Sequence, residues 1–213
     1  MNGTPDPEKL TVAIADVDEK AALEIFQRML EAGEDPAEVL EVCRRGMSVV
    51  GQRFESGKYF LSEMIMAAEI FNEILGMVRP RLGRIEEKPL GRIVLGTVQG
   101  DVHDIGKNIM IAMLEAERFQ VIDLGVDVPP EKFIDAIKEY QPDVVGMSGL
   151  LTSAIESMKN TVESIRATGL TARIKIVIGG GRADEIAREY TGADAFADNA
   201  AKGVEIIKAM IVG

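Results

Sequence analysis

The sequence Gly100-Asp101-Val102-His103-Asp104-Ile105-Gly106 lies between an apolar run at 93–95 and a helical pattern that begins near Lys107. It contains the only histidine of the 213 residues. A lone histidine is more often structural than a ligand, but this one follows an expected strand, where open α/β sheets bind their ligands. Asp101 can accept a hydrogen bond from one ring nitrogen, which fixes the tautomer and leaves the other nitrogen for a metal. The sequence therefore predicts a strand, a ligand-bearing loop and a helix in succession.

Apolar, strand-like runs alternate with helical patterns from residue 89 onward. The expected strands span 92–98, 119–124, 143–147, 173–178 and 193–196, and the expected helices span 107–117, 130–140, 154–168, 183–190 and 201–211. Nearly continuous apolar strands separated by helices are typical of a parallel sheet that is covered on both faces. We therefore expect a flavodoxin-like (Rossmann-like) α/β domain over 89–213, with five parallel strands in the order 2-1-3-4-5 and a crevice between strands 1 and 3.

The chain before this domain has the periodicity of four helices with short connections, which predicts an antiparallel four-helix bundle. Asp35 is the expected N-cap of the third helix, with Pro36 at its first position. Ser62 is the expected N-cap of the fourth helix. The charged segment 83–89 is the expected linker and hinge, so the helical cap domain with its linker takes up 1–88.

Composition excludes several classes of protein. The chain has 24 basic and 35 acidic residues and a formal net charge of −11, so it repels nucleic acid and anionic membrane surfaces. No apolar run reaches the roughly 20 residues of a membrane span, and the first residues lack the pattern of a signal peptide, which predicts a cytoplasmic protein. Cys43 is the only cysteine, which excludes an internal disulfide and any CxxC metal or redox site. Its helical surroundings favour a structural thiol over a nucleophile.

Three loops are expected to meet at the carboxyl edge of the sheet. They span 101–106, 148–152 and 179–181, and they follow strands 1, 3 and 4. Glycines at strand ends often only make turns, so 179–181 taken alone leaves that alternative open. The first loop lacks the glycine pattern of a phosphate-binding turn. A loop with a ligand-type histidine, facing glycines that allow close approach to the backbone, predicts a deep slot with a metal at its mouth.

These loops resemble a known signature. Asp101-x-His103-x-x-Gly106, followed by Ser148-x-Leu150 and Gly179-Gly180, is similar to the cobalamin-binding signature of methionine synthase, cobalamin-dependent mutases and corrinoid proteins. The segments 57–63 and 67–69 resemble the helical cap that precedes this module in methyl-transferring members. The chain as a whole therefore resembles the small corrinoid protein of a methyltransferase system, such as those that serve methylamine, methanol or aryl methyl ether (O-demethylase) demethylation.

The resemblance implies roles for individual residues. His103 would be the metal ligand, in the lower position on the cobalt of cobalamin or a related corrinoid, and Asp101 would hold its other ring nitrogen; these two form the implied catalytic pair. Phe60 and Met64 would cover the upper face of the cofactor, with packing in the bundle core as the alternative. The other implied cofactor-binding residues are Val102, Asp104, Ile105, Gly106, Ser148, Leu150, Thr152, Gly179, Gly180 and Gly181.

The resemblance also implies a function. The protein would shuttle a methyl group, as methylcobalamin, between a donor-specific methyltransferase and an acceptor methyltransferase that uses tetrahydrofolate or a thiol. A reductive activator is a further implied partner, and the chain would not catalyse alone. A cobalamin-dependent regulator or light sensor is the alternative, although the bundle is too acidic to bind DNA. A phosphate-receiver domain is disfavoured because it needs an aspartate where this chain has Ser148.

One position departs from the resemblance. Methionine synthase has a hydroxyl side chain two residues after the threonine of the motif, and this hydroxyl extends the histidine–aspartate pair toward solvent. Here that position is Ala154, and the neighbouring Ser153 is expected to point elsewhere. We therefore expect the proton relay to end at Asp101.

Overall fold

The computed structural model describes residues 6–78 and 89–212. The chain divides into two compact units, Met1–Lys88 and Pro89–Gly213, and each is described by itself. Apart from Pro89, the expected linker 83–89 lies outside the described residues. Within the described ranges, no helix has the length and apolar character needed to cross a membrane.

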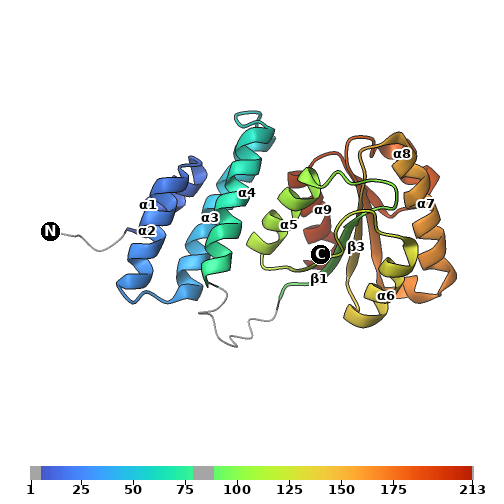
Figure 1. Cartoon of the computed structure of the whole chain (residues 1–213), viewed down its shortest axis with the longest axis horizontal. Coiled ribbons are helices and arrows are strands. Elements are labelled where there is room, and N and C mark those ends of the chain that lie inside the picture. Colours follow the sequence, from blue (N-terminus) through green and yellow to red (C-terminus); the bar gives the residue numbers. More distant parts are fainter. Residues whose placement is uncertain (1–5, 79–88, 213) are drawn as a thin grey trace. The chain divides into compact units, whose positions relative to one another are not determined.

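The first unit contains four helices that pack side by side, which confirms the predicted helical bundle (Figure 1). They are α1 (Pro7–Ala15), α2 (Glu19–Glu31), α3 (Pro36–Glu55) and α4 (Leu61–Val78). The Asp35 side chain accepts a hydrogen bond from the Ala37 N–H at 2.9 Å, so the predicted cap of α3 is correct. The predicted cap at Ser62 is wrong, because α4 already begins at Leu61. Instead, the Glu63 carboxylate accepts the Phe60 N–H at 2.8 Å, so this carboxylate satisfies a backbone donor at the start of the helix.

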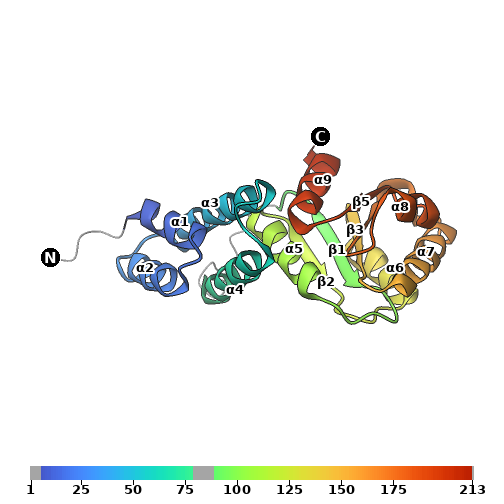
Figure 2. The same cartoon turned by 90° about the horizontal axis from the view of Figure 1, so that it is seen from above.

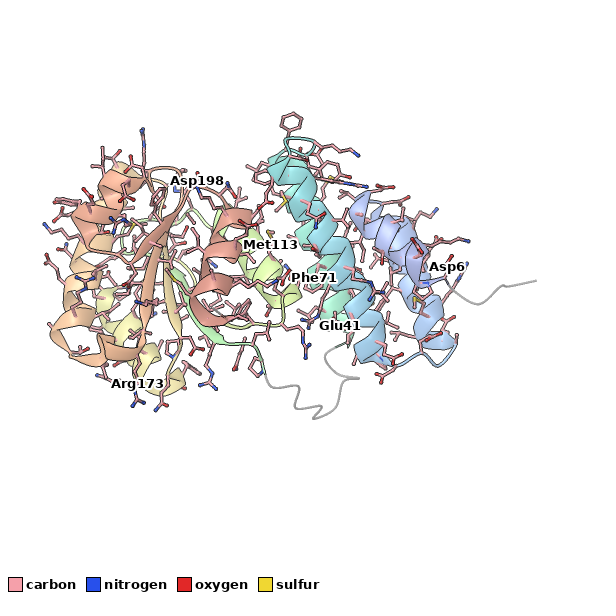
Figure 3. The ribbon with its side chains drawn as sticks, turned by 180° about the vertical axis from the view of Figure 1, so that it is seen from behind. Asp6, Glu41, Phe71, Met113, Arg173 and Asp198 are labelled. Atoms are coloured by element: carbon pink, nitrogen blue, oxygen red, sulfur yellow. The ribbon has the colours of Figure 1, made fainter. Side chains whose placement is uncertain are left out.

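The bundle core consists of apolar side chains that repeat with helical spacing. Phe71, labelled in Figure 3, lies on α4 and is fully buried, as are Phe26 on α2 and Ile14 on α1. A Cβ atom at Gly46 of α3 would lie only 2.7 Å from the Cβ atom of Ile14, so the glycine allows α1 and α3 to approach closely. The buried apolar stripe therefore packs these helices together, and an ion pair between Arg53 of α3 and Asp16 at the end of α1 adds to it.

The second unit is a five-stranded parallel sheet with the order β2-β1-β3-β4-β5, as predicted. Its strands are β1 (Arg92–Thr97), β2 (Gln120–Asp123), β3 (Val144–Ser148), β4 (Lys175–Gly179) and β5 (Ala195–Ala197). Its helices are α5 (Ile105–Ala116), α6 (Pro130–Tyr140), α7 (Thr152–Ala167), α8 (Glu185–Thr191) and α9 (Ala200–Val212). A short 3-10 helix, Leu170–Arg173, precedes β4 and was not predicted.

Helices cover both faces of the sheet (Figure 2). One hydrophobic cluster joins the sheet to α6, α7 and α8 and includes Phe133 and Met158, and the other joins it to α5 and α9 and includes Leu114 and Ile207. Strand register pairs Thr97 with Ser148 and Ser148 with Gly179. Because side chains alternate along a strand, these three small residues form a row at the carboxyl edge on the α5/α9 face.

Candidate functional site

The loop between β1 and α5 begins as a tight turn at the carboxyl edge of the sheet. The Val98 N–H donates to the Ser148 carbonyl at 3.0 Å, and the Asp101 N–H donates back to the Val98 carbonyl at 3.1 Å. Gly100 has φ +83°, a left-handed conformation that suits glycine. The buried Thr97 hydroxyl donates to the His103 carbonyl at 3.1 Å. The main chain on both sides of Asp101 is therefore ordered by local hydrogen bonds.

Asp101 is the centre of the site. Its side chain is buried, with 1% of the residue exposed. Its Oδ1 atom accepts the His103 N–H at 3.0 Å and lies 2.7 Å from Nδ1 of the same histidine. Its Oδ2 atom accepts the N–H groups of Leu150 at 2.7 Å and Leu151 at 3.0 Å. One carboxylate thus joins the loop after β1 to the loop after β3.

These four donors determine the charge of the carboxylate. Burial alone would raise the pKa of Asp101, but the backbone donors of Leu151, His103 and Leu150 and the His103 ring outweigh burial and hold the pKa well below its usual range. Asp101 is therefore ionised and accepts a hydrogen bond from the Nδ1–H group of His103. The lone pair is then on Nε2, and 49% of the histidine side chain is exposed. This arrangement leaves the second ring nitrogen of His103 available to bind a metal.

The loop after β3 contributes small and apolar groups. Ser148 is half-buried at the end of β3, and within the described ranges its hydroxyl forms no hydrogen bond. Leu150 is 47% exposed. Thr152, the first residue of α7, is exposed, whereas Ala154 is buried. The second oxygen of Asp101 is thus satisfied by backbone N–H groups and not by a hydroxyl group at the start of α7.

The glycines at and after the end of β4 differ in how strongly the surrounding atoms require a glycine. A Cβ atom at Gly180, where φ is +113°, would lie 2.0 Å from the Gly149 carbonyl oxygen, so packing between the two loops requires this glycine. A Cβ atom at Gly181 would lie 2.7 Å from the Leu150 side chain. At Gly179 it would meet only the Ala197 carbonyl oxygen, at 3.5 Å, and at Gly106 it would meet nothing within 4 Å. Packing against neighbouring groups therefore does not require a glycine at Gly179 or at the exposed Gly106.

The remaining predicted residues lie around this loop or in the helical unit. Val102 is 66% exposed and Ile105 is 57% exposed, so both present apolar surface near His103. The Asp104 carboxylate accepts a hydrogen bond from the Asn108 side chain at 3.1 Å. In the helical unit, Phe60 is 71% exposed, whereas Met64 is 2% exposed and fits the alternative role in the core.

Two polar side chains beside the loop were not predicted. Lys107 is 3% exposed, and its Nζ atom lies 2.8 Å from both carboxylate oxygens of Asp123, at the end of β2. A positively charged side chain in the first turn of a helix, such as Lys107 in α5, interacts unfavourably with the helix dipole. This unusual position was the only hint in the sequence that Lys107 has a specific partner. Asp127 accepts the Gly100 N–H at 2.8 Å and donates its own N–H to the Asp101 carbonyl at 3.0 Å. These contacts depend on how distant loops meet, which periodicity does not reveal.

The donor set determines which kind of metal centre fits. Within residues 6–78 and 89–212, no group of three or more histidine, cysteine or carboxylate side chains could hold a metal ion. His103, with 49% of its side chain exposed, could therefore supply only a single protein ligand. It suits a metal whose other ligands are supplied by a large cofactor, and Gly106 and Gly179 could lie beside part of such a group.

Comparison with known proteins agrees with this geometry. Family models described as B12 binding domains match residues 91–207 and 7–79. The chain is 34% identical to trimethylamine corrinoid protein 1 of Methanosarcina acetivorans, over 94% of each chain. A cobalamin-binding protein from Desulfitobacterium hafniense is similar in structure, with 40% identity, a TM-score of 0.75 and coverage of 97% of this chain and 98% of that one. The methanol:cobalamin methyltransferase complex of Methanosarcina barkeri gives a TM-score of 0.82 at 29% identity, covering 97% and 80%.

Proposed function

The chain belongs to the B12-binding corrinoid proteins, and on that premise we propose that it is the methyl carrier of a cobalamin-dependent methyltransferase system. When bound, the corrinoid supplies a cobalt atom that accepts and donates the methyl group. The observation that carries the proposal is the His103–Asp101 pair, in which 49% of the histidine side chain is exposed and Nδ1 is held by an ionised carboxylate.

His103 is the lower ligand of cobalt in this proposal. Asp101 keeps the ring in the tautomer that ligates through Nε2 and raises the basicity of that nitrogen. The backbone donors of Leu150 and Leu151 keep Asp101 in place. The chain therefore controls the electronic state of the metal through one ligand and its supporting carboxylate.

The slot for the tail of the cofactor lies on the α5/α9 face of the sheet. Gly179 and Gly106 leave room for a flat group, and the Ser148 hydroxyl is able to bond a ring nitrogen within it. Gly180 shapes the slot indirectly, because it lets the loops after β3 and β4 touch. Val102, Ile105 and Leu150 provide apolar surface for the macrocycle.

The partner enzymes supply the specificity. The system includes a methyltransferase partner, as in the methanol:cobalamin methyltransferase complex that this chain resembles. We assign donor recognition to that partner, with acceptor transfer to tetrahydrofolate or a thiol on a second methyltransferase and reduction of inactive cobalt by a separate activator.

Reconstitution tests this function. The purified chain, loaded with cobalamin, is expected to show a histidine-ligated visible spectrum and to accept methyl groups stoichiometrically once a cognate methyltransferase and its substrate are added. A chain that fails to bind cobalamin, or that binds it without a spectral contribution from His103, would overturn the proposal.

A further inference from the structure

Asp127 contacts the backbone on both sides of Asp101. Its Oδ1 atom accepts the Gly100 N–H at 2.8 Å, and its own N–H donates to the Asp101 carbonyl at 3.0 Å. The two bonds run in opposite directions between the loop after β2 and the loop after β1. The Gln99–Gly100 and Asp101–Val102 peptide groups are therefore both held by one residue.

Asp127 has an unusual backbone conformation. Its φ is +53°, in the left-handed region that non-glycine residues seldom occupy. Aspartate is among the side chains that tolerate this region. The residue is also exposed, so burial of its side chain does not explain the conformation. Strained residues of this kind persist where surrounding contacts require them, often beside functional groups.

We propose that Asp127 is a positioning residue for the metal ligand. Asp101 can bond His103 with Oδ1 and the Leu150 and Leu151 N–H groups with Oδ2 only if its own backbone is fixed in rotation. Asp127 restrains that rotation from the opposite side of the loop. It holds the Asp101–Val102 peptide group through the Asp101 carbonyl and anchors the chain one peptide before Asp101 through the Gly100 N–H. This inference rests on the proposed role of His103. It adds that the loop after β2 helps to position this histidine.

The ring of His103 can be observed directly, because it is the only histidine in the chain. In the cofactor-free full chain labelled with 15N-histidine, the two ring nitrogens give a single pair of signals. The chemical shifts of the two ring nitrogens report which of them carries the proton. We expect the wild type to show one tautomer, protonated at Nδ1.

Two substitutions of Asp127 separate the hydrogen bond from the backbone strain. Asp127→Gly removes the acceptor but adopts φ +53° freely, and Asp127→Asn keeps both an acceptor oxygen and tolerance of this conformation. We expect Asp127→Gly to shift the histidine signals toward the average of the two tautomers, and Asp127→Asn to restore the wild-type signals. Asp127→Gly should also weaken cobalamin binding roughly two- to tenfold, the range expected for one lost hydrogen bond.

Gln141→Gly is the matched control. Gln141 also has a left-handed backbone, with φ +47°, but it is the C-cap of α6 and lies toward the amino end of β3, away from the site. We expect this variant to leave the histidine signals and cobalamin binding unchanged. Unchanged histidine signals in Asp127→Gly, or an equal change in Gln141→Gly, would overturn the positioning role.

The test distinguishes this inference from the proposed function. If His103→Ala leaves the visible spectrum of the loaded protein unchanged, His103 is not the ligand and the proposed function fails. If His103→Ala alters the spectrum but Asp127→Gly alters neither the spectrum at fixed pH nor the histidine signals, only the role of Asp127 fails. A lower unfolding temperature in Asp127→Gly with unchanged histidine signals would show a purely structural role and would also overturn the inference.

Discussion

Oδ1 of Asp101 lies 2.7 Å from Nδ1 of His103, while the second oxygen of the same carboxylate accepts two backbone N–H groups from the loop after β3. Both oxygens are therefore occupied, and the histidine is coupled to the edge of the sheet and not to solvent. If His103 binds a metal, a change in the strength of that bond is therefore transmitted to the Asp101 carboxylate. Substitution of either His103 or Asp101 measures this coupling.

Loss of the ligand should leave cofactor binding largely intact. We predict that His103→Ala still binds cobalamin, because the slot contacts come from three loops, whereas its visible spectrum shifts to the form without histidine ligation. Titration of the purified variant with cobalamin measures both quantities. A spectrum identical to that of the wild type would refute the assignment of His103.

Loss of the Asp101 carboxylate should affect histidine ligation more than addition of a hydroxyl group at position 154. Asparagine at 101 has one acceptor oxygen, so either the ring or the two backbone donors lose their partner, at a cost of about 1–3 kcal/mol. Because those donors already satisfy Oδ2, we predict that Asp101→Asn weakens histidine ligation more than Ala154→Ser changes it. Absorbance of the methylated protein against pH measures both effects. A larger effect of Ala154→Ser would indicate that a hydroxyl at 154 extends the relay.

The low pKa of Asp101 predicts a pH dependence of stability in the cofactor-free protein. Because folding lowers the pKa, the carboxylate stabilises the native state fully above about pH 4, the ordinary range of aspartate, and this stabilisation is lost as pH falls below it. The free-energy difference between wild type and Asp101→Asn should therefore be largest near neutral pH and shrink in acid. Urea unfolding at about pH 7 and about pH 3 measures it. A difference that stays constant over this range would contradict the low pKa.

Sequence periodicity predicts this fold well because two different periods alternate along the chain. Strands buried on both faces form continuous apolar runs, and the helix 130–140 was predicted with its observed bounds. The ends were less predictable: β3 includes Ser148 and α7 begins at Thr152, because hydrogen bonds between neighbouring strands and loops decide where each element ends. The start of α4 was missed because Glu63, and not Ser62, satisfies the first donor.

The sheet topology predicted that the three loops meet, but individual contacts within the site were predictable only between residues that are close in sequence. The spacing of Asp101 and His103 indicates their hydrogen bond. The partners of Oδ2, by contrast, come from the loop after β3, and the contacts of Asp127 come from the loop after β2. Gly180 shows the same limit, since its glycine is required by the Gly149 carbonyl and not by a ligand. Such long-range contacts depend on the folded sheet.

The slot can be tested at a position where the fold tolerates a side chain. A bulky residue at Gly180 would collide with the backbone of the neighbouring loop, so that variant would confuse misfolding with blocked binding. At Gly179 a Cβ atom makes only an ordinary contact, and a β-branched residue suits a strand end. We predict that Gly179→Val keeps its unfolding temperature but binds cobalamin at least about tenfold more weakly, equivalent to about 1.4 kcal/mol. Isothermal titration measures the affinity.

Gly76→Ala on α4 provides the control for that experiment, because its added Cβ atom meets nothing within 4 Å and lies in the helical unit. It should bind cobalamin like the wild type. Wild-type affinity in Gly179→Val, with the fold intact, would place the tail of the cofactor elsewhere.

The carrier role makes a final prediction about turnover. Cleavage of a methyl ether, amine or alcohol requires a group that activates the leaving atom, but Asp101 is ionised and fully bonded, and His103 is assigned to the metal. Burial raises the pKa of the Cys43 thiol to about 12, so this cysteine is not an available nucleophile or acid. We therefore predict that the chain loaded with reduced cobalamin demethylates none of these substrates alone and gains activity only when a cognate methyltransferase is added. Cys43→Ala should be equally active in the mixture. Product formation by the isolated chain, measured by chromatography, would refute the carrier role in favour of a self-sufficient enzyme.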